Sequence, residues 1–199
     1  MTIGIIGSGA IGSAFARALA GAKIPSIIAN SRGPDSLAAL VRDIGPTVKA
    51  GTREAAAAAD LVLVAVNWSK LPAALSGLPD WDGRIVIDAN NPIEAPLFRP
   101  VDLKGRSSSE VFADLVPGAR VVKAFNHLQP HLIAGDPHAQ GGRRILFYAG
   151  DDGRAKAEIG QLIERLGFFG IDLGALAAGG RLVQFPGGPL PSHNLVKFD

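Results

Sequence analysis

Short apolar runs alternate with helix-like segments along most of the chain. Residues 61–66 and 85–88 are apolar at almost every position, as strands buried on both faces of a sheet are. Residues 10–21 instead place Ile11, Phe15 and Leu19 on one helical stripe, together with Ala14 and Ala18. These patterns predict strands over 3–6, 26–29, 47–49, 61–66, 85–88, 120–124, 145–149 and 168–172, and helices over 10–21, 34–44, 55–59 and 153–166.

Helix boundaries carry their own signals. Pro34 suits a first helical turn, and Thr52 is an N-cap residue before the alanine tract. Asp151 or Asp152 is expected to cap the last helix. Strand–helix alternation of this kind predicts an α/β fold with a doubly wound, mainly parallel sheet and a small C-terminal extension. Two longer stretches without periodicity, 90–107 and 186–193, are candidates for site-forming loops.

Composition narrows the class of protein. Of 199 residues, 47% are hydrophobic, which excludes disorder, and 25 Gly with 14 Pro exclude a coiled coil. The absence of cysteine excludes disulfides, thiolate metal sites and a cysteine nucleophile. A formal charge of +2 is too small to indicate a nucleic-acid partner.

The apolar N-terminus does not read as a targeting segment. Its first charged residue is Arg17, inside the apolar stretch, whereas a signal peptide carries positive charge before it. The longest apolar run elsewhere, 61–66, is far shorter than the ~20 residues that span a bilayer. We therefore expect a cytoplasmic protein with no membrane partner.

The strongest local signal is a glycine motif at the end of the first predicted strand. Gly7, Gly9 and Gly12 form G-x-G-x-x-G with Ser8, Ala10 and Ile11 between them, and the motif opens an amphipathic helix. The glycines allow a tight turn, a close approach to a pyrophosphate, and close helix–strand packing. The helix N-terminus adds free N–H groups and partial positive charge. This context predicts a Rossmann-type dinucleotide site, in a binding domain over 1–142 with a small α/β part over 143–199 packed on it.

The end of the second predicted strand indicates which dinucleotide binds. An NAD site places an acidic residue there, but this chain has Asn30, Ser31, Arg32 and Gly33. Without the carboxylate a 2′-phosphate is not repelled, and the Arg32 guanidinium matches phosphate geometry. Ser31 adds a hydroxyl donor and Gly33 an N–H group. The expected cofactor is NADP(H).

Several common catalytic arrangements are absent from the sequence. Tyr148, the sole tyrosine, has no lysine four residues later, and there is no H-E-x-x-H or G-x-S-x-G motif. His127 and His131 share i, i+4 spacing, but Pro130 lies between them and no third ligand is evident, so no metal site is predicted. No catalytic side chain is assigned; His127 is kept as a possible substrate contact.

Four segments together resemble a known family. They are Gly7–Gly12, Asn30–Pro34, the run Asp88-Ala89-Asn90-Asn91-Pro92, and the run Val122-Lys123-Ala124-Phe125-Asn126. This pattern is similar to the NADP oxidoreductases that depend on the deazaflavin coenzyme F-420, and the cytosolic reductase domains of the STEAP ferric reductases share it. The resemblance implies NADPH binding and hydride transfer to a deazaflavin or flavin-type ring, with ferric reduction through the flavin as a further option.

The resemblance also implies site residues and an assembly. Val66, Asn67 and Trp68 are expected along the cofactor, and Asn90, Asn91 and Pro92 by the nicotinamide. Ala124, Phe125 and Asn126 are expected near its carboxamide, with a place in the core as the alternative for Phe125. The acceptor would be a small molecule such as coenzyme F-420, FMN or FAD, and the protein a homodimer, with 195–198 either docking on a neighbour or covering its own domain.

Hydride transfer between two redox-active rings needs no side-chain nucleophile, because the cofactors carry the difficult chemistry. Two other functions stay open on the sequence. Reduction of a small carbonyl or imine would ask for a proton donor at the nicotinamide, and only His127 or Lys123 presents itself. A non-catalytic NADP-binding sensor would bind the dinucleotide with its nicotinamide face blocked.

Overall fold

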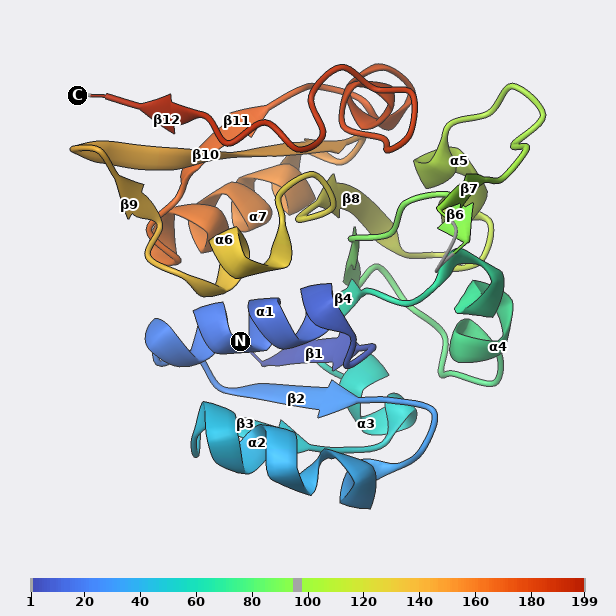
Figure 1. Cartoon of the computed structure of the whole chain (residues 1–199). Coiled ribbons are helices and arrows are strands. Elements are labelled where there is room, and N and C mark those ends of the chain that lie inside the picture. The colour runs from blue at the N-terminus through green and yellow to red at the C-terminus, as the bar shows by residue number, and fades with distance from the viewer. Residues whose placement is uncertain (1, 95–97, 199) are drawn as a thin grey trace.

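A single twisted sheet forms the centre of the protein. The computed structural model describes residues 2–94 and 98–198, and its main strands follow the order β11-β10-β8-β5-β4-β1-β2-β3 (Figure 1). Strands β3, β2, β1, β4, β5 and β8 are parallel to one another, whereas β10 runs antiparallel to β8. The main strands are β1 (Ile3–Ile6), β2 (Ser26–Ala29), β3 (Val48–Ala50), β4 (Leu61–Val64), β5 (Ile85–Asp88), β8 (Arg120–Ala124), β10 (Gly142–Gly150) and β11 (Phe169–Asp172).

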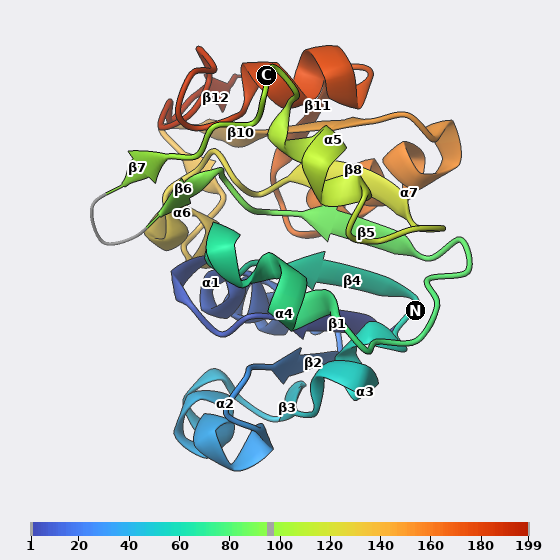
Figure 2. The ribbon, with the colours of Figure 1, turned by 90° about the vertical axis from the view of Figure 1, so that its right-hand side faces the viewer.

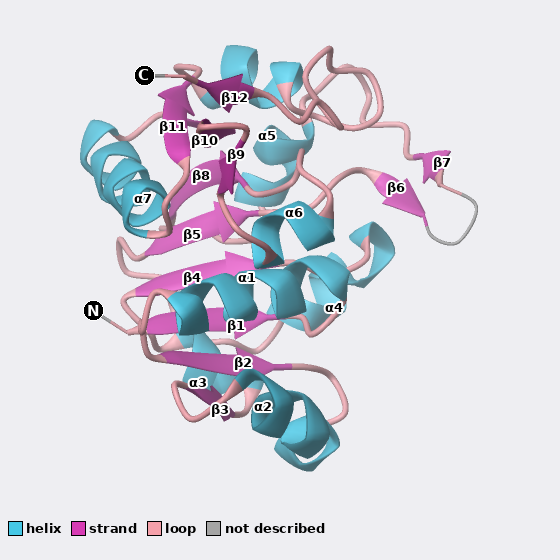
Figure 3. Ribbon diagram, turned by 60° about the vertical axis from the view of Figure 1, so that its left-hand side comes forward, coloured by secondary structure: helices cyan, strands magenta, loops and turns pink. Residues whose placement is uncertain are grey.

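Helices cover both faces of this sheet, which makes the fold the predicted doubly wound α/β architecture. One face carries α1 (Ala10–Gly21), α2 (Ala38–Ile44), α6 (Pro130–Ala134) and α7 (Gly153–Arg165), several of which stand in front of the strands in Figure 3. The other face carries α3 (Arg53–Ala57), α4 (Leu71–Leu75) and α5 (Ser108–Ala113), and Figure 2 shows α4 and α5 in front of the sheet. The strand order reverses direction between β1 and β4, where a dinucleotide crevice forms in such folds.

Most predicted elements are present, with shifted ends. Residues 120–124 form β8 as expected, but β4 stops at Val64, because the chain then leaves the sheet and the N–H of Val66 donates to Asn90 Oδ1 at 2.9 Å. The segment predicted as one helix over 34–44 is a 3₁₀ turn, η1 (Pro34–Leu37), followed by α2. Thr52 caps α3, and Asp152 rather than Asp151 caps α7.

The loops contain short elements that the periodicity did not predict. Within 90–107, β6 (Ile93–Glu94) and β7 (Arg99–Pro100) form a two-stranded ribbon. Pro130 begins helix α6 instead of interrupting a helix, so His127 lies before α6 and His131 inside it. The remaining elements are η2 (Trp68–Lys70), the π-helical turn η3 (Leu176–Gly180), and β9 (His138–Ala139) and β12 (Val196–Lys197), which both pair with β10.

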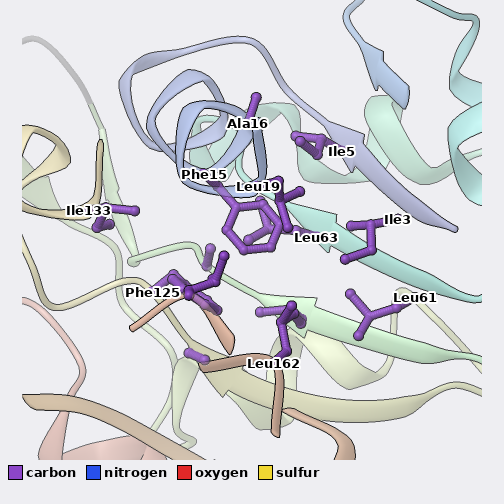
Figure 4. Close-up of a cluster of buried hydrophobic side chains, with 14 of the residues drawn as sticks. Ile3, Ile5, Phe15, Ala16, Leu19, Leu61, Leu63, Phe125, Ile133 and Leu162 are labelled. Carbon is purple, nitrogen blue, oxygen red and sulfur yellow. The ribbon is translucent and has the colours of Figure 1, made fainter. Parts of the chain in front are cut away.

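The core beneath α1 fixes the edge of the sheet where the site lies. Phe15 of α1 meets Phe125 edge-on, with ring centroids 4.7 Å apart, and both are fully buried (Figure 4). Ile133 of α6 and Leu162 of α7 pack into the same cluster. In the described part of the chain, no helix has the length and apolar character to cross a bilayer.

Candidate functional site

The turn between β1 and α1 can be made only by glycine at two positions. Gly7 has φ of +112°, and a Cβ there would lie 2.0 Å from the Ala65 carbonyl oxygen. A Cβ on Gly12 would lie 1.9 Å from the Gly7 carbonyl oxygen, so Gly12 lets α1 approach the turn closely. The helix start is therefore held directly at the carboxyl end of β1.

The N-terminus of α1 borders open space at Gly9. A Cβ on Gly9 would meet no atom of the described residues within 4 Å, apart from its own chain neighbours. No side chain caps the helix, and no acidic residue lies in its first turn. A twelve-residue helix thus presents unpaired N–H groups and its positive dipole end to open space, which suits an anion.

The loop after β2 presents a free cation beside this turn. Asn30 Oδ1 accepts from the Arg32 N–H at 2.9 Å, and Asn30 Nδ2 donates to Ser8 Oγ at 3.2 Å. Asn30 therefore ties the β2 loop to the glycine turn. The Arg32 side chain is exposed and makes no ion pair within residues 2–94 and 98–198. We call residues 7–12 and 30–33 the phosphate end of the site.

A cleft of about 780 Å³ runs along the carboxyl ends of β1, β2, β4 and β5. No carboxylate lines it within the described residues, whereas Arg32, Arg53 and Lys70 do. The sequence-predicted residues that line it are Gly7, Ser8, Gly9, Ala10, Ile11, Asn30, Ser31, Arg32, Val66, Asn67, Trp68, Asn90 and Asn91.

Arg53 and Lys70 line the cleft but were not predicted. Arg53 begins α3, and its Nη1 donates to the carbonyls of Ala73 at 2.7 Å and Ala74 at 3.1 Å near the end of α4. Lys70 ends η2, directly after the loop that leaves β4. Both follow strands of the parallel sheet, and that position was the available sequence signal, because loops at the carboxyl ends of such strands form the crevice.

The opposite end of the cleft is built around a buried ion pair. Lys123 Nζ lies 2.9 Å from Asp88 Oδ2, both side chains are fully buried, and the two residues are register partners on β8 and β5. Lys123 also donates to the Asn90 carbonyl and, at 3.4 Å, to Ser108 Oγ. Burial lowers the pKa of the Lys123 ammonium, and the Asp88 carboxylate opposes that shift.

Both asparagines of the β5 loop are held by hydrogen bonds. Asn90 donates its N–H and its Nδ2 to Asp88 Oδ1, at 3.0 and 2.9 Å, and accepts from Val66. Asn91 pairs reciprocally with Asn126: its Nδ2 donates to the Asn126 carbonyl at 2.8 Å, and its Oδ1 accepts from Asn126 Nδ2 at 2.9 Å. Asn91 Oδ1 also accepts from the Phe185 N–H at 3.0 Å. We call Val66 with residues 88–91 and 123–127 the ring end of the site.

Six sequence-predicted residues do not line the cleft. Ala124 and Phe125 are fully buried, and the Phe125 ring points into the core against Phe15 (Figure 4). Asn126 is 6% exposed and hydrogen-bonds to Asn91, while Gly12, Gly33 and Pro92 are not among the residues that line the cleft. The loop 186–193 does not line the cleft either; the Ser192 N–H donates to the His127 carbonyl at 2.8 Å.

The two proton donors that the sequence offered are both withdrawn from the cleft. Burial lowers the pKa of the His127 imidazole to about 4, and its ring packs against Phe147 with centroids 5.1 Å apart. Lys123 is fully buried in the ion pair. No cluster of three or more metal-ligating His, Asp or Glu side chains occurs among the residues that the structure describes.

Comparison with known proteins agrees with this geometry. Residues 2–92 match the family described as NADP oxidoreductase, coenzyme F420-dependent. A candidate F420-dependent NADP-reductase from Arthrobacter sp. FB24 superposes with a TM-score of 0.73 at 29% identity, over 87% of this chain and 85% of that one. Residues 2–92 of this chain therefore resemble that family of NADP oxidoreductases.

Other relatives of this chain are similar over nearly its whole length. A hypothetical protein from Sinorhizobium meliloti is 47% identical with a TM-score of 0.93, over 99% of this chain and 96% of that one. Metalloreductase STEAP3 from Rattus norvegicus is 29% identical over 96% of this chain, which spans only 37% of the length of that relative. The similarity therefore extends beyond β5 into the part of the chain that forms the ring end.

Proposed function

We propose that this NADP oxidoreductase transfers hydride between NADP(H) and a flavin-type ring, with the deazaflavin coenzyme F-420, FMN or FAD as the acceptor. The observation that carries the proposal is the chemistry of the cleft wall. At the ring end, the cleft-lining residues of the described chain are apolar or are amides, and none of them titrates. An acceptor that asks the protein for no proton fits such a wall.

The phosphate end is suited to NADP(H). The pyrophosphate would bind the N–H groups of the Ser8–Ile11 turn, where the open space over Gly9 admits it. The 2′-phosphate would then bind Ser31, Arg32 and the Gly33 N–H, because Arg32 has no other ionic partner in the described chain. With the dinucleotide held so, its nicotinamide extends toward β4 and β5.

The wall at the ring end would orient the nicotinamide without taking part in bond changes. Val66, Asn67 and Trp68 follow β4, and Asn90 and Asn91 follow β5, so two strand ends flank one stretch of cleft. The side chains of Asn90 and Asn91 are committed to the protein, so the wall is stiff. When bound, the nicotinamide supplies the hydride chemistry. The protein holds the two rings at a contact distance of about 3–3.5 Å and limits access of water.

The competing function, reduction of a carbonyl or imine, would need a proton donor. That donor would lie beside the oxygen or nitrogen bonded to the carbon that accepts the hydride. Reduction of a carbonyl or imine places negative charge or a proton demand on oxygen or nitrogen. Neither His127 nor Lys123 reaches the cleft, since one is 3% exposed and the other fully buried. Their positions therefore favour a conjugated ring acceptor over a small carbonyl or imine.

Stopped-flow oxidation of bound NADPH tests the proposal. NADPH is mixed with the chain and then with coenzyme F-420, FMN, FAD, or a panel of ketones and imines, and its absorbance is followed. We expect turnover with at least one flavin-type ring and none with the panel. Turnover with a ketone or imine alone would contradict the proposal, and oxidation by none of the acceptors would favour a sensor.

The proposal includes a homodimer, as the resemblance implies. The C-terminal segment does not need a neighbour, since β12 pairs with β10 of its own chain. Leu195 and Phe198 nevertheless stay 41% and 57% exposed. Sedimentation of the full chain measures the state directly, and a monomer at all concentrations would remove the dimer from the proposal.

A further inference from the structure

We infer that Lys123 is a positioning residue: it clamps the Asn90 loop and thereby sets where the nicotinamide half of the dinucleotide lies, although it does not touch the cleft. This inference rests on the proposed function and adds to it a residue buried behind the binding surface. It follows from three features of the ring end.

The first feature is that every donor of the ammonium has an acceptor. Lys123 Nζ is 2.9 Å from Asp88 Oδ2 and 3.4 Å from Ser108 Oγ, and its third partner is the Asn90 carbonyl. An ammonium group carries three donors. One of the three partners is therefore the backbone of a residue that lines the cleft.

The second feature is that the pair clamps Asn90 from two sides. Lys123 holds the carbonyl of Asn90, while Asp88 Oδ1 holds its N–H and its side-chain Nδ2. The remaining polar atom of the side chain, Oδ1, accepts from the Val66 N–H at 2.9 Å. The loops that follow β4 and β5 are thus fixed relative to each other through one buried charge pair.

The third feature is that a pair of apolar residues in place of Asp88 and Lys123 would stabilise the fold at least as well. A buried ion pair is costly to desolvate, and replacement of such pairs by apolar residues is often neutral or stabilising. Neighbouring strand positions at this depth, such as Val122 and Ile87, are apolar and fully buried. The directional hydrogen bonds to Asn90 are what an apolar pair would lack.

The test compares two ligands that share the phosphate end and differ at the ring end. NADPH reaches both ends, whereas adenosine 2′,5′-bisphosphate has no nicotinamide. Each is titrated against the unaltered chain, Lys123→Met, and the double variant Asp88→Asn with Lys123→Met, which leaves no unpaired buried charge. Calorimetry gives both affinities, and the emission of bound NADPH reports on the nicotinamide environment.

We expect NADPH to bind about tenfold more weakly to both variants, which corresponds to about 1.4 kcal/mol, and its bound emission to change. Adenosine 2′,5′-bisphosphate should bind all three proteins within about twofold of one another, a difference of less than about 0.5 kcal/mol. The control is Leu162→Ala, a core change on α7 at a residue that does not line the cleft and makes no hydrogen bond to Asn90, which should leave the ratio of the two affinities unaltered.

Other outcomes overturn the inference. Equal weakening of both ligands, or of neither, would mean that Lys123 does not act on the ring end. If neither variant folds, the pair is a requirement of folding and the positioning role falls. If the unaltered chain binds neither ligand, the proposed function itself is wrong, and that result is distinct from a loss confined to the variants.

Discussion

The two ends of the cleft are built in opposite ways. The phosphate end comes from segments close together in the chain, residues 7–12 and 30–33. Within the described residues, its helix N-terminus has no side-chain cap and its exposed Arg32 has no ion pair. The ring end is held by hydrogen bonds between residues far apart in the chain, with sequence separations of 24, 33, 35 and 94 positions. Its polar side chains hydrogen-bond to one another. One end keeps its hydrogen-bonding capacity for a ligand; the other uses most of its capacity to hold itself in place.

This contrast separates two tasks that a dinucleotide enzyme performs. Affinity comes from open donors and free charge, because these gain partners only when the phosphates bind. Orientation of a reactive ring comes from a wall that does not move, because hydride transfer depends on short, well-aligned contacts. A network of side chains that are mostly hydrogen-bonded to one another is suited to the second task, and a surface with open donors to the first.

The largest expected effect comes from Lys123→Met. Removal of one partner of a buried ion pair costs about 3–5 kcal/mol, because the other charge is left uncompensated. We expect that loss in the free energy of unfolding by urea, followed through Trp68 and Trp81. The double variant with Asp88→Asn should regain most of it.

The matched control for this change is Lys70→Met at the cleft surface. It should alter the free energy of unfolding by less than about 0.5 kcal/mol, as surface substitutions usually do. Similar losses for Lys70→Met and Lys123→Met would show that the buried ion pair contributes no more to stability than an exposed lysine of the cleft.

The second effect is a sensitivity to acid that belongs to the ring end. The unfolded chain binds a proton at His127 with the ordinary pKa of 6.5, whereas burial lowers the pKa in the folded protein to about 4. Between these values the unfolded state holds more protons, so stability falls as the pH falls through this window. The full difference is about 3 kcal/mol by pH 4, at 1.36 kcal/mol per pKa unit.

Urea unfolding at a series of pH values between 7 and 4 measures this slope. His127→Phe should flatten it, while His131→Gln, at an exposed position on α6, should leave it as it is. An unchanged slope in His127→Phe would mean that the acid sensitivity arises elsewhere.

The local structure of residues 7–12 and 30–33 was predictable from the sequence because its signals are local. The glycine motif, the amphipathic stripe of α1 and the residues after β2 lie within the first 33 positions, and each imposes its own geometry. At the ring end, the sequence predicted which residues take part but not which of them contact one another. That Lys123 meets Asp88 depends on the register of β8 on β5, which no periodicity reports.

Some missed features did have a local signal. Ser107 and Glu110 form a capping box, S-x-x-E, at the start of α5, and this pattern is visible in the sequence. The extension of β10 back to Gly142 had none, since it depends on pairing with β9 and β12. The sequence allowed two interpretations of Phe125, near the nicotinamide carboxamide or in the core. The packing of its ring against Phe15 assigns it to the core.

The third effect concerns the phosphate end. If Arg32 holds the 2′-phosphate, Arg32→Ala should weaken NADPH binding about ten- to a hundredfold and hardly affect NADH, since a hydrogen bond to a charged group contributes about 1.5–3 kcal/mol. The loss should shrink at high salt, because the guanidinium is exposed. Fluorescence titration of both dinucleotides measures it.

Arg17→Ala is the matched control, since Arg17 is also on the surface but pairs with Asp43 on α2. It should leave the ratio of the NADPH and NADH affinities unchanged. Equal weakening of both dinucleotides by Arg32→Ala would remove the arginine from the phosphate site and the preference for NADP(H) with it.

The smallest effect is expected from removal of the C-terminal residues 193–199. It tests whether β12 is part of the structure that supports the ring end. The C-terminal part reaches the ring end through the Phe185 N–H on Asn91 and the Ser192 N–H on His127, and then crosses to β10. A chain ending at Ser192 keeps the first two contacts and loses β12 with the bond from the Ile145 N–H to the Leu195 carbonyl. At about 1 kcal/mol for a hydrogen bond, we expect an unfolding free energy lower by about 1–2 kcal/mol.

The affinities for NADPH and adenosine 2′,5′-bisphosphate should both be unchanged, because everything that holds Asn91 is still present. Sedimentation of the same chain shows whether 195–198 holds a dimer. A selective loss of NADPH affinity would place β12 within the support of the ring end and move its boundary to the C-terminus.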